Sequence, residues 1–251
     1  MKLSVVLATY NEEKNIRTCL NSVVKWCDEI VVVDGSSTDN TVKIAKEFSA
    51  KIIVTDNPPI FHINKQKAID AAQSEWILQL DADEYVTPEL EHEIKTVIKS
   101  GYKDGYWIPR KNYFLGRFLM KGGIYPDYTL RLYRRGKGKL PQKDVHEQAV
   151  VKGVVGYLTS PLVHMADPSL SRYLFRFARY TDLLADQLEQ ELNAPSLFNF
   201  INYIFIKPVS WFFSTYVRHK GFMDLWQGFV FSFMSALRFP FAYLKFLKNK
   251  V

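Results

Sequence analysis

The chain has 251 residues, enough for one large α/β domain with an additional segment. Its 33 lysine and arginine residues outnumber its 26 aspartate and glutamate residues, which gives a formal net charge of +7. Two cysteines are too few for a disulfide framework, and no signal-peptide pattern precedes the first predicted strand, so we expect a cytoplasmic protein.

The excess positive charge is concentrated near the C-terminus. Residues 197–251 contain seven basic residues and a single acidic residue, Asp224, so a net charge of +6 lies in this segment. The segment is also rich in Phe, Trp and Tyr. A basic, aromatic segment is typical of proteins that bind an anionic surface, and we expect a membrane because no recognised nucleic-acid-binding module accompanies the charge.

The first third of the chain alternates between short apolar runs and helical patterns. Strands are predicted at residues 3–8, 29–33, 51–54 and 76–80. Helices are predicted between them, around residues 16–24, 42–48 and 63–72. This alternation predicts a doubly wound α/β fold with a parallel sheet and right-handed crossovers.

Polar loops follow three of these strands, at residues 9–13, 34–39 and 81–84. Because the carboxyl ends of parallel strands meet at one edge of a sheet, we expect the three loops to converge there. The third loop holds three acidic residues in four positions, and crowded carboxylates repel one another unless a cation lies between them. The alternative is an acidic loop that merely opens the helix beginning near Thr87 and Pro88.

The loop after the first strand excludes two common nucleotide-binding designs. It contains neither the Gly-x-Gly-x-x-Gly pattern of dinucleotide-binding domains nor a Walker loop. A metal held by the acidic loop is the predicted substitute for handling phosphates.

Three motifs together resemble glycosyltransferase family 2. They are Val6-Leu7-Ala8-Thr9-Tyr10-Asn11-Glu12-Glu13, Val33-Asp34-Gly35-Ser36-Ser37-Thr38-Asp39 and Leu80-Asp81-Ala82-Asp83-Glu84. The resemblance implies the GT-A type fold, a mostly parallel sheet flanked by helices. Residues 76–84 and the later Val145-His146-Glu147 more narrowly resemble the bacterial lipopolysaccharide core β-glucosyltransferases and their lipooligosaccharide relatives.

This resemblance implies roles for the residues that would bind the nucleotide-sugar donor. Thr9, Tyr10 and Glu12 would line the nucleotide pocket. Asp34 would hold the base, and Asp81 would contact the ribose. For Asp34, a turn-forming role before a glycine is compatible with contact to the ligand.

The resemblance also implies a metal site and a catalytic base. Asp83 would bind Mg²⁺ or Mn²⁺ bridging the donor's diphosphate, and a metal would stabilise the charge of that leaving group. His164 could reach the metal or the diphosphate, and a structural hydrogen-bonding role is the alternative. An inverting transfer needs a carboxylate to take the acceptor's proton; Glu147 is the first candidate and Asp144 the second, with a mixed-charge surface loop as the alternative.

The pattern is weaker after residue 84. Helices are predicted at 88–99 and 169–192, strands at 105–109 and 129–135, and a loop over the site at 110–128. Arg131 and Arg134 would either contact phosphate or lie on a solvated edge strand. Arg172, Arg176 and Arg179 share one helix face, which could meet phosphates, lipid headgroups or solvent.

The predicted domains are a GT-A catalytic domain at 1–192 and a helical tail at 193–251. The catalytic domain would have a nucleotide-sugar half at 1–100 and an acceptor half at 101–192. The uncharged runs at 192–206 and 225–237 are shorter than the roughly 18–20 apolar residues of a spanning helix. We therefore expect helices that lie in the membrane interface, with a cap packed on the catalytic domain as the alternative.

The predicted function is metal-dependent, inverting transfer of a hexose at the inner face of the cytoplasmic membrane, to which the protein would attach peripherally. The expected donor is UDP-glucose, and the expected acceptor is a lipid-anchored saccharide such as the lipopolysaccharide or lipooligosaccharide inner core. The Gln-x-x-Arg-Trp motif of processive synthases is absent, which indicates a single addition. Polyprenyl phosphate and capsule or glycoprotein precursors are alternative acceptors.

Two alternatives belong to other classes of protein. A sugar-1-phosphate nucleotidyltransferase would have a Gly-rich first loop containing Arg, which this chain lacks. A non-catalytic, membrane-bound nucleotide-sugar-binding protein would keep the donor site and not require the base.

Overall fold

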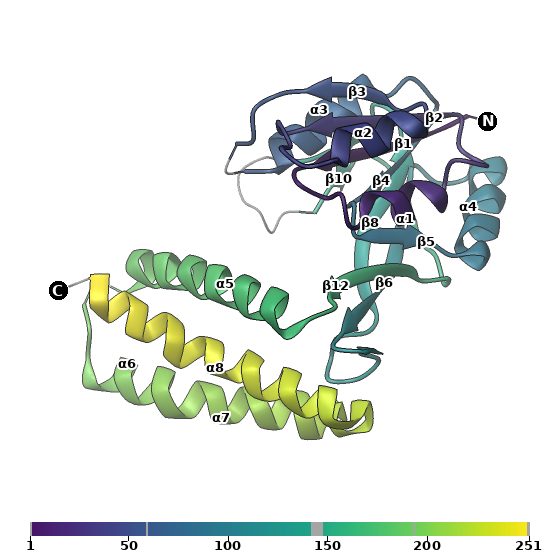
Figure 1. Ribbon diagram of the computed structural model, residues 1–251. Coiled ribbons are helices and arrows are strands. Elements are labelled where there is room, and N and C mark those ends of the chain that lie inside the picture. Colours follow the sequence, from purple (N-terminus) through teal and green to yellow (C-terminus); the bar gives the residue numbers. More distant parts are fainter. Residues whose placement is uncertain (1, 59, 142–147, 193, 250–251) are drawn as a thin grey trace. The chain divides into compact units, whose positions relative to one another are not determined.

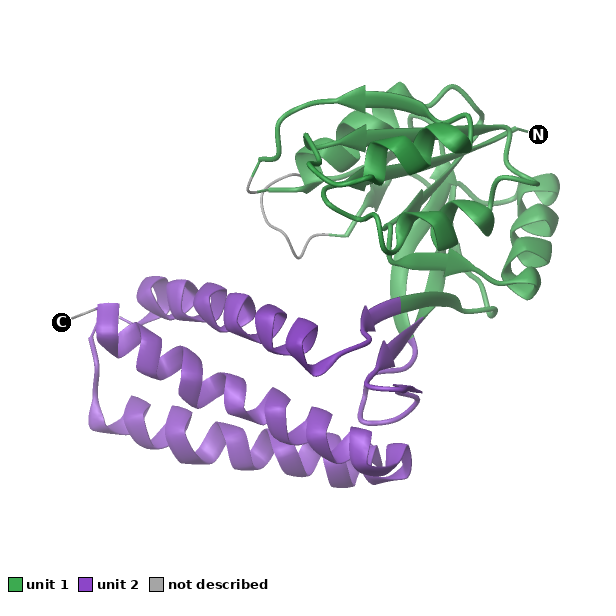
Figure 2. Ribbon diagram, in the orientation of Figure 1, with its two compact units in different colours: residues 1–110, 127–164 green, residues 111–126, 165–251 purple. Residues whose placement is uncertain are grey.

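The computed structural model describes residues 2–58, 60–141, 148–192 and 194–249 (Figure 1). The chain divides into two compact units (Figure 2): unit 1 contains residues 1–110 and 127–164, and unit 2 contains residues 111–126 and 165–251. This division differs from the domain boundary predicted at residue 192. The long helix α5 (Leu170–Glu191) belongs with the C-terminal helices because it packs against α8 (Leu225–Asn249).

Unit 1 is built on a sheet whose first four strands are parallel, as the alternating pattern predicted. These strands are β1 (Leu3–Thr9), β2 (Glu29–Asp34), β3 (Lys51–Val54) and β4 (Trp76–Leu80), in the spatial order β3-β2-β1-β4. The connecting helices are α1 (Ile16–Asn21), α2 (Thr41–Glu47) and α3 (His62–Ala71). In the β1–β2 register Thr9 lies opposite Asp34, so both strands end at the same edge.

The sheet continues beyond β4 with mainly antiparallel strands. They are β8 (Asp127–Arg134), β6 (Gly105–Phe114), β12 (Leu162–Asp167) and β5 (Glu84–Val86), with β7 (Arg117–Phe118) and β11 (Val155–Tyr157) also paired to β6. A separate pair joins β9 (Gly138–Lys139) to β10 (Val150–Val151), and α4 (Pro88–Ser100) follows β5. The α/β class is confirmed, and the sheet is mixed.

For this part of the chain, one of the alternatives left open and one prediction are wrong. Strand β8 lies between β4 and β6, so residues 129–135 do not form a solvated edge strand. Residues 110–128 are not one loop, because β6 continues to Phe114 and β7 pairs back onto it.

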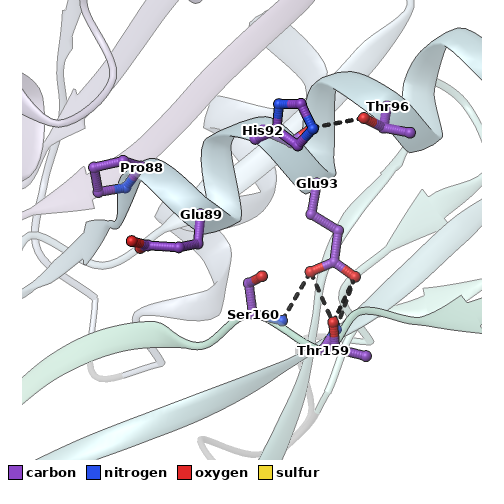
Figure 3. A pocket seen from close by; sticks show the side chains of 7 residues that line it. All are labelled: Pro88, Glu89, His92, Glu93, Thr96, Thr159 and Ser160. Carbon is purple, nitrogen blue, oxygen red and sulfur yellow. Dashed lines mark hydrogen bonds between the residues drawn. The ribbon is translucent and has the colours of Figure 1, made fainter.

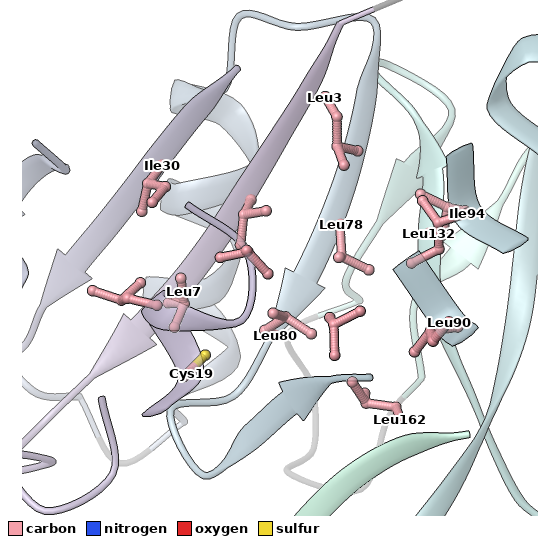
Figure 4. Packing of buried hydrophobic residues seen from close by; sticks show 14 of the residues in the cluster. Leu3, Leu7, Cys19, Ile30, Leu78, Leu80, Leu90, Ile94, Leu132 and Leu162 are labelled. Atoms are coloured by element: carbon pink, nitrogen blue, oxygen red, sulfur yellow. The ribbon is translucent and has the colours of Figure 1, made fainter. Parts of the chain in front are cut away.

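Apolar residues on the two faces of the sheet form two separate clusters. Val5 and Leu78 belong to the cluster covered by α1, α2 and α4, whereas Val6 and Ile77 belong to the cluster covered by α3. Successive residues of a strand point to opposite faces, which explains this division. Figure 4 shows the first cluster, in which Leu78 and Leu80 of β4 lie near side chains of α4. Both faces of β4 are therefore buried, as its uninterrupted apolar run predicted.

Unit 2 consists mainly of helices that lie side by side (Figure 1). After α5, a continuous helical stretch contains α6 (Leu197–Ile201), the π-helical η1 (Asn202–Ile206), α7 (Lys207–Phe212) and the π-helical η2 (Phe213–Arg218). A short 3₁₀ turn, η3 (Gly221–Asp224), leads into α8. Helix α8 packs against α5 and against α7.

Among the described residues, one helix is long and apolar enough to cross a membrane, judged by length and composition alone. It covers Gly221–Asn249 and has a mean hydropathy of 1.2 in its most apolar stretch. Of that stretch 28% is buried. No membrane-spanning helix was predicted from the sequence, because Arg238 ends the uncharged run. In the structure, α8 continues through Arg238 and Pro240.

We predict that Leu78→Ala destabilises the protein by about 3 kcal/mol, since it removes a fully buried side chain and leaves a cavity between β4 and α4. Denaturant unfolding would measure this loss. The matched control is Val54→Ala on β3, where the side chain is 62% exposed and the expected change is below about 0.5 kcal/mol. Equal losses for the two variants would contradict the prediction.

Candidate active site

The loops after β1 and β2 meet at the buried carboxylate of Asp34. Its Oδ2 accepts hydrogen bonds from Thr9 Oγ1 at 2.8 Å and Ser37 Oγ at 2.7 Å, and its Oδ1 accepts one from the Ser37 backbone N–H at 2.7 Å. Three donors hold the carboxylate in one orientation. The turn-forming role considered for Asp34 is therefore present.

Asn11 fastens the same two loops and was not singled out from the sequence. Its backbone N–H donates to Ser37 Oγ at 2.8 Å, and its Oδ1 accepts from the Thr38 backbone N–H at 2.9 Å. Its φ of +54° lies in the left-handed region, which asparagine adopts more readily than most residues. An asparagine directly after a buried strand is a weak sequence signal for this role.

Tyr10 and Glu12 occupy different environments in the first loop. The Tyr10 side chain is 46% exposed, so its ring is open to contact. The Glu12 carbonyl accepts the N–H groups of Asn15 and Ile16 at the start of α1, and its carboxylate accepts from Asn15 Nδ2 at 2.7 Å. Glu12 thus also shapes the beginning of α1.

The acidic loop after β4 is neutralised by two cations from distant parts of the chain. Asp81 forms ion pairs with Lys65 of α3 and with Arg131 of β8, the latter at 2.5 Å. The buried carboxylate of Glu84 accepts from Arg131 at 2.8 Å and from the Asp81 backbone N–H at 2.9 Å, and Arg110 lies 3.4 Å from it. Lys65 and Arg131 therefore supply the positive charge that the crowded carboxylates require.

The electrostatics of this cluster keep Asp81 ionised. Burial would raise the pKa of Asp81, but the charges of Arg131 and Lys65 outweigh it and hold that pKa well below its usual range. The pKa of Lys65 is lowered, chiefly by burial, and the charge of Asp81 opposes this effect. Burial also works against the charge of Arg131, yet Asp81 and Glu84 raise the pKa of that guanidinium.

Asp83, in the same loop, lies next to His164 of β12. His164 Nε2 is 3.5 Å from Asp83 Oδ2, and both side chains are mostly buried. They meet because β12 pairs antiparallel with β5 and places His164 opposite Glu84. Residues 2–58, 60–141, 148–192 and 194–249 contain no group of three or more His, Cys, Asp or Glu side chains arranged to hold a metal.

The donor set of Asp83 and His164 nevertheless fits a metal that diphosphate oxygens help to hold. A carboxylate oxygen and an imidazole nitrogen suit first-row ions such as Mn²⁺, and Mg²⁺ is commonly bound by one carboxylate together with substrate phosphates. The metal-binding role of the two residues stays a prediction.

The two candidates for the catalytic base, Asp144 and Glu147, lie outside the described residues. The chain on either side of them is attached to unit 1. The Leu140 backbone N–H donates to Gln66 Oε1 of α3 at 2.8 Å, and Gln148 Oε1 accepts from the Leu130 backbone N–H of β8 at 3.4 Å.

Four of the arginines considered for phosphate binding make contacts within the protein. In unit 1, Arg131 joins the acidic loop, and Arg134 pairs with Glu75 and lies 4.8 Å from the ring of Trp76. In unit 2, Arg172 and Arg176 donate to the Ala166 carbonyl at 3.0 and 3.3 Å. These contacts stabilise the sheet and the start of α5.

A separate hollow of about 640 Å³ lies between α4 and the turn before β12 (Figure 3). It is lined by Pro88, Glu89, His92, Glu93, Thr96, Thr159 and Ser160, none of which belongs to the loops described above. Glu93 accepts the backbone N–H groups of Thr159 at 2.9 Å and Ser160 at 2.8 Å. The Glu93 carboxylate thus links the turn before β12 to α4.

Comparison with known families and proteins gives consistent matches. A family model described as glycosyl transferase family 2 matches residues 4–155. The lipopolysaccharide core biosynthesis glycosyltransferase LpsC of Rhizobium meliloti (strain 1021) is 28% identical over 258 residues, which cover 95% of this chain and 92% of LpsC. An uncharacterized glycosyltransferase of Rickettsia bellii (strain RML369-C) is 27% identical and covers 98% of this chain and 84% of its own.

Two solved structures share the fold. The mannosyltransferase PcManGT from Pyrobaculum calidifontis, in complex with GDP-Man and Mn²⁺, has a TM-score of 0.60 at 13% identity and covers all of this chain and 88% of its own. S. aureus TarS 1-349 has a TM-score of 0.50 at 20% identity, covering 99% of this chain and 89% of its own.

We predict that Asp81→Asn lowers the free energy of unfolding by about 3 kcal/mol at pH 7, because it removes the counter-charge of Lys65 and one of the two carboxylates that pair with Arg131. The folded pKa of Asp81 is depressed, so its contribution is fully present above the unfolded pKa of about 3.9 and is lost as the pH falls further. Urea unfolding would be measured from pH 7 to pH 3. The difference in the free energy of unfolding between wild type and variant should become smaller below about pH 4.

Glu91→Gln serves as the control, because Glu91 forms a partly exposed i,i+4 pair with Lys95 that is worth less than about 0.5 kcal/mol. If the difference in the free energy of unfolding between wild type and Asp81→Asn stays constant down to pH 3, the charge of the carboxylate is not the source of that difference.

Proposed function

Because the chain belongs to glycosyltransferase family 2, we propose that it transfers a hexose, with inversion, from a nucleotide sugar to a lipid-anchored saccharide. The observation that carries the proposal is the convergence of three loops at one sheet edge. This edge gathers Asp34 after β2, Asp81 and Asp83 after β4, and His164 from β12. Open α/β sheets bind their ligands at such an edge.

The donor side of the proposal uses the loops after β1 and β2. The exposed ring of Tyr10 would contact the nucleotide directly. The Thr9 hydroxyl donates to Asp34, so Thr9 would orient the carboxylate that holds the base. Glu12 would act by shaping the loop, and Asp81, held by Lys65 and Arg131, would face the ribose.

The diphosphate side uses Asp83 and His164, which would hold Mg²⁺ or Mn²⁺. Bound there, the metal would stabilise the charge of the nucleoside diphosphate leaving group without a proton transfer. Asp81 and Glu84 are paired with Lys65 and Arg131, whereas Asp83 lies 3.5 Å from His164 of β12, and we assign the metal to these two residues.

We propose UDP-glucose as the donor and a lipopolysaccharide or lipooligosaccharide core saccharide as the acceptor. The relationship to LpsC, which extends over 95% of this chain, supports this acceptor class. An acceptor carried by a lipid would place the enzyme at the inner face of the cytoplasmic membrane. The basic, aromatic helices of unit 2 are suited to peripheral attachment there.

We predict that Asp83→Ala reduces UDP release from UDP-glucose by about 100-fold, because the metal loses its carboxylate ligand. Purified enzyme would be incubated with UDP-glucose, Mn²⁺ and deacylated core oligosaccharide, with and without EDTA. Glu47→Ala removes an exposed carboxylate that pairs with Arg17 on the surface and should retain wild-type turnover. Release that neither EDTA nor Asp83→Ala reduces would refute the metal site.

A further prediction concerns the base. We expect Glu147→Gln to abolish transfer to the acceptor while UDP still binds, because the acceptor hydroxyl loses the group that takes its proton. Asp144→Asn should show the smaller defect. Transfer rates and UDP affinity measured by calorimetry would separate the two effects. Intact transfer in both variants would exclude this segment as the source of the base.

A further inference from the structure

The helices of unit 2 form a single layer with α8 in the middle, flanked by α5 and α7 (Figure 2). Folded domains usually bury apolar surface between two layers. Many large apolar side chains of this layer are exposed, including Phe205, Phe213, Trp226 and Phe233. An exposed apolar surface of this extent marks a site of interaction.

The helical stretch at 197–218 has a repeat of four residues that separates two faces. Every fourth residue is exposed by between 42% and 58%: Ile201, Phe205, Val209, Phe213 and Val217. A repeat of four drifts by about 40° per step around an α-helix. The wider π-helical turns η1 and η2 offset this drift, so the exposed residues stay on one face.

The opposite face of this stretch packs on α8 with the same four-residue repeat. Tyr203 stacks on Tyr243 with ring centroids 5.4 Å apart, and Trp211 Nε1 donates to Ser235 Oγ at 3.1 Å. Phe229 of α8 contacts the rings of Phe212 and Tyr216. These contacts hold the two helices together.

Two half-buried cations, Lys207 and Arg238, lie on aromatic rings within this layer. Lys207 Nζ is 3.7 Å from the ring centroid of Tyr203, and Arg238 Cζ is 4.1 Å from that of Trp211. Both cations also lie near Phe239, at 6.0 and 4.8 Å. Among the described residues, neither cation has a carboxylate partner, and Arg238 Nε is buried without a hydrogen bond.

Two other basic residues of unit 2 are paired with acids. Lys245 pairs with Asp182 at 2.6 Å, and Arg117 lies 3.5 Å from Asp224. Asp224 is buried and accepts the backbone N–H groups of Met120 and Lys121. It is also the only acid in residues 197–251, so this segment presents aromatic groups and positive charge without an exposed carboxylate.

We propose that Lys207 and Arg238 bind the phosphate groups of anionic phospholipids while the exposed aromatic surface of unit 2 lies in the bilayer interface. The inference rests on the membrane attachment proposed above and adds the residues that contact the lipid. Aromatic rings stabilise a cation that has lost water, and a lipid phosphate would supply the missing counter-charge and hydrogen-bond acceptor. Long basic side chains reach headgroups from helices that lie in the interface.

The test is co-sedimentation of the full chain with vesicles of phosphatidylcholine alone or of phosphatidylcholine mixed with phosphatidylglycerol. We expect the wild type to prefer the anionic vesicles. The double variant Lys207→Gln/Arg238→Gln should bind them roughly 30-fold more weakly, since each basic residue near an anionic surface contributes about 1 kcal/mol. The control Lys245→Gln/Lys248→Gln removes the same formal charge and should lose less than about fivefold.

Arg238→Lys covers the case in which the double variant does not fold. It keeps the charge but not the planar group stacked on Trp211, so we expect about fivefold weaker binding to anionic vesicles. Binding equal to wild type would overturn the proposed site. Circular dichroism and donor hydrolysis would check that each variant is folded.

Three results would overturn the inference: equal losses in both double variants, equal wild-type binding to both vesicle types, or a stable dimer in which a second copy covers the aromatic surface. Intact UDP release by a wild-type protein that binds neither type of vesicle would refute the lipid site and leave the transferase chemistry standing. Vesicle binding without UDP release from any donor would refute the proposed reaction alone.

Discussion

The placement of two cations against the acidic loop is the interaction on which the site depends. Lys65 and Arg131 flank Asp81, and Arg131 also binds the buried Glu84. Without them, the negative charges after β4 would repel one another in a partly buried space. Since Glu84 also accepts the Asp81 N–H, the same cluster fixes the backbone that carries Asp83. Helix α3, strand β8 and the acidic loop are thereby fastened together at the edge where β1 and β2 also end.

This arrangement gives the carboxylates of one short motif different tasks. Asp81 and Glu84 are neutralised by the protein itself, whereas Asp83 is paired with an imidazole that can share a metal. The loops after β1 and β2 form a second rigid element around Asp34, held by Thr9 and Ser37. A glycosyltransferase needs both elements prearranged, because catalysis depends on groups fixed where charge develops. Unit 2 differs from unit 1, since its exposed aromatic side chains and the cations Lys207 and Arg238 are suited to contact with a surface outside the protein.

Much of unit 1 could be predicted because its signals are local. Apolar runs such as Trp76–Leu80 end at polar residues, and alternation with helices indicates parallel strands whose loops converge. Thr9, Asp34 and Asp81 were therefore expected at one edge, and the structure places them there. Other features had no local signal. From the sequence, Arg131 is a basic residue on a strand of alternating polarity. It is buried because β8 lies between β4 and β6.

The sequence by itself determined the alternation of strands and helices along the nucleotide half, the three motifs and hence the glycosyltransferase family, because these depend on short-range periodicity and contiguous residues. Tertiary structure decided which charged groups meet. Asp81 pairs with Lys65, 16 positions before it, and with Arg131, 50 positions after it. The pairing of β5 with β12 brings His164 next to Asp83. Tertiary structure also decided that α5 joins the C-terminal helices and that Lys207 and Arg238 lie on aromatic rings without acids. Such pairings depend on how helices and strands pack against one another, and the spacing of residues along a single helix or strand does not determine that packing.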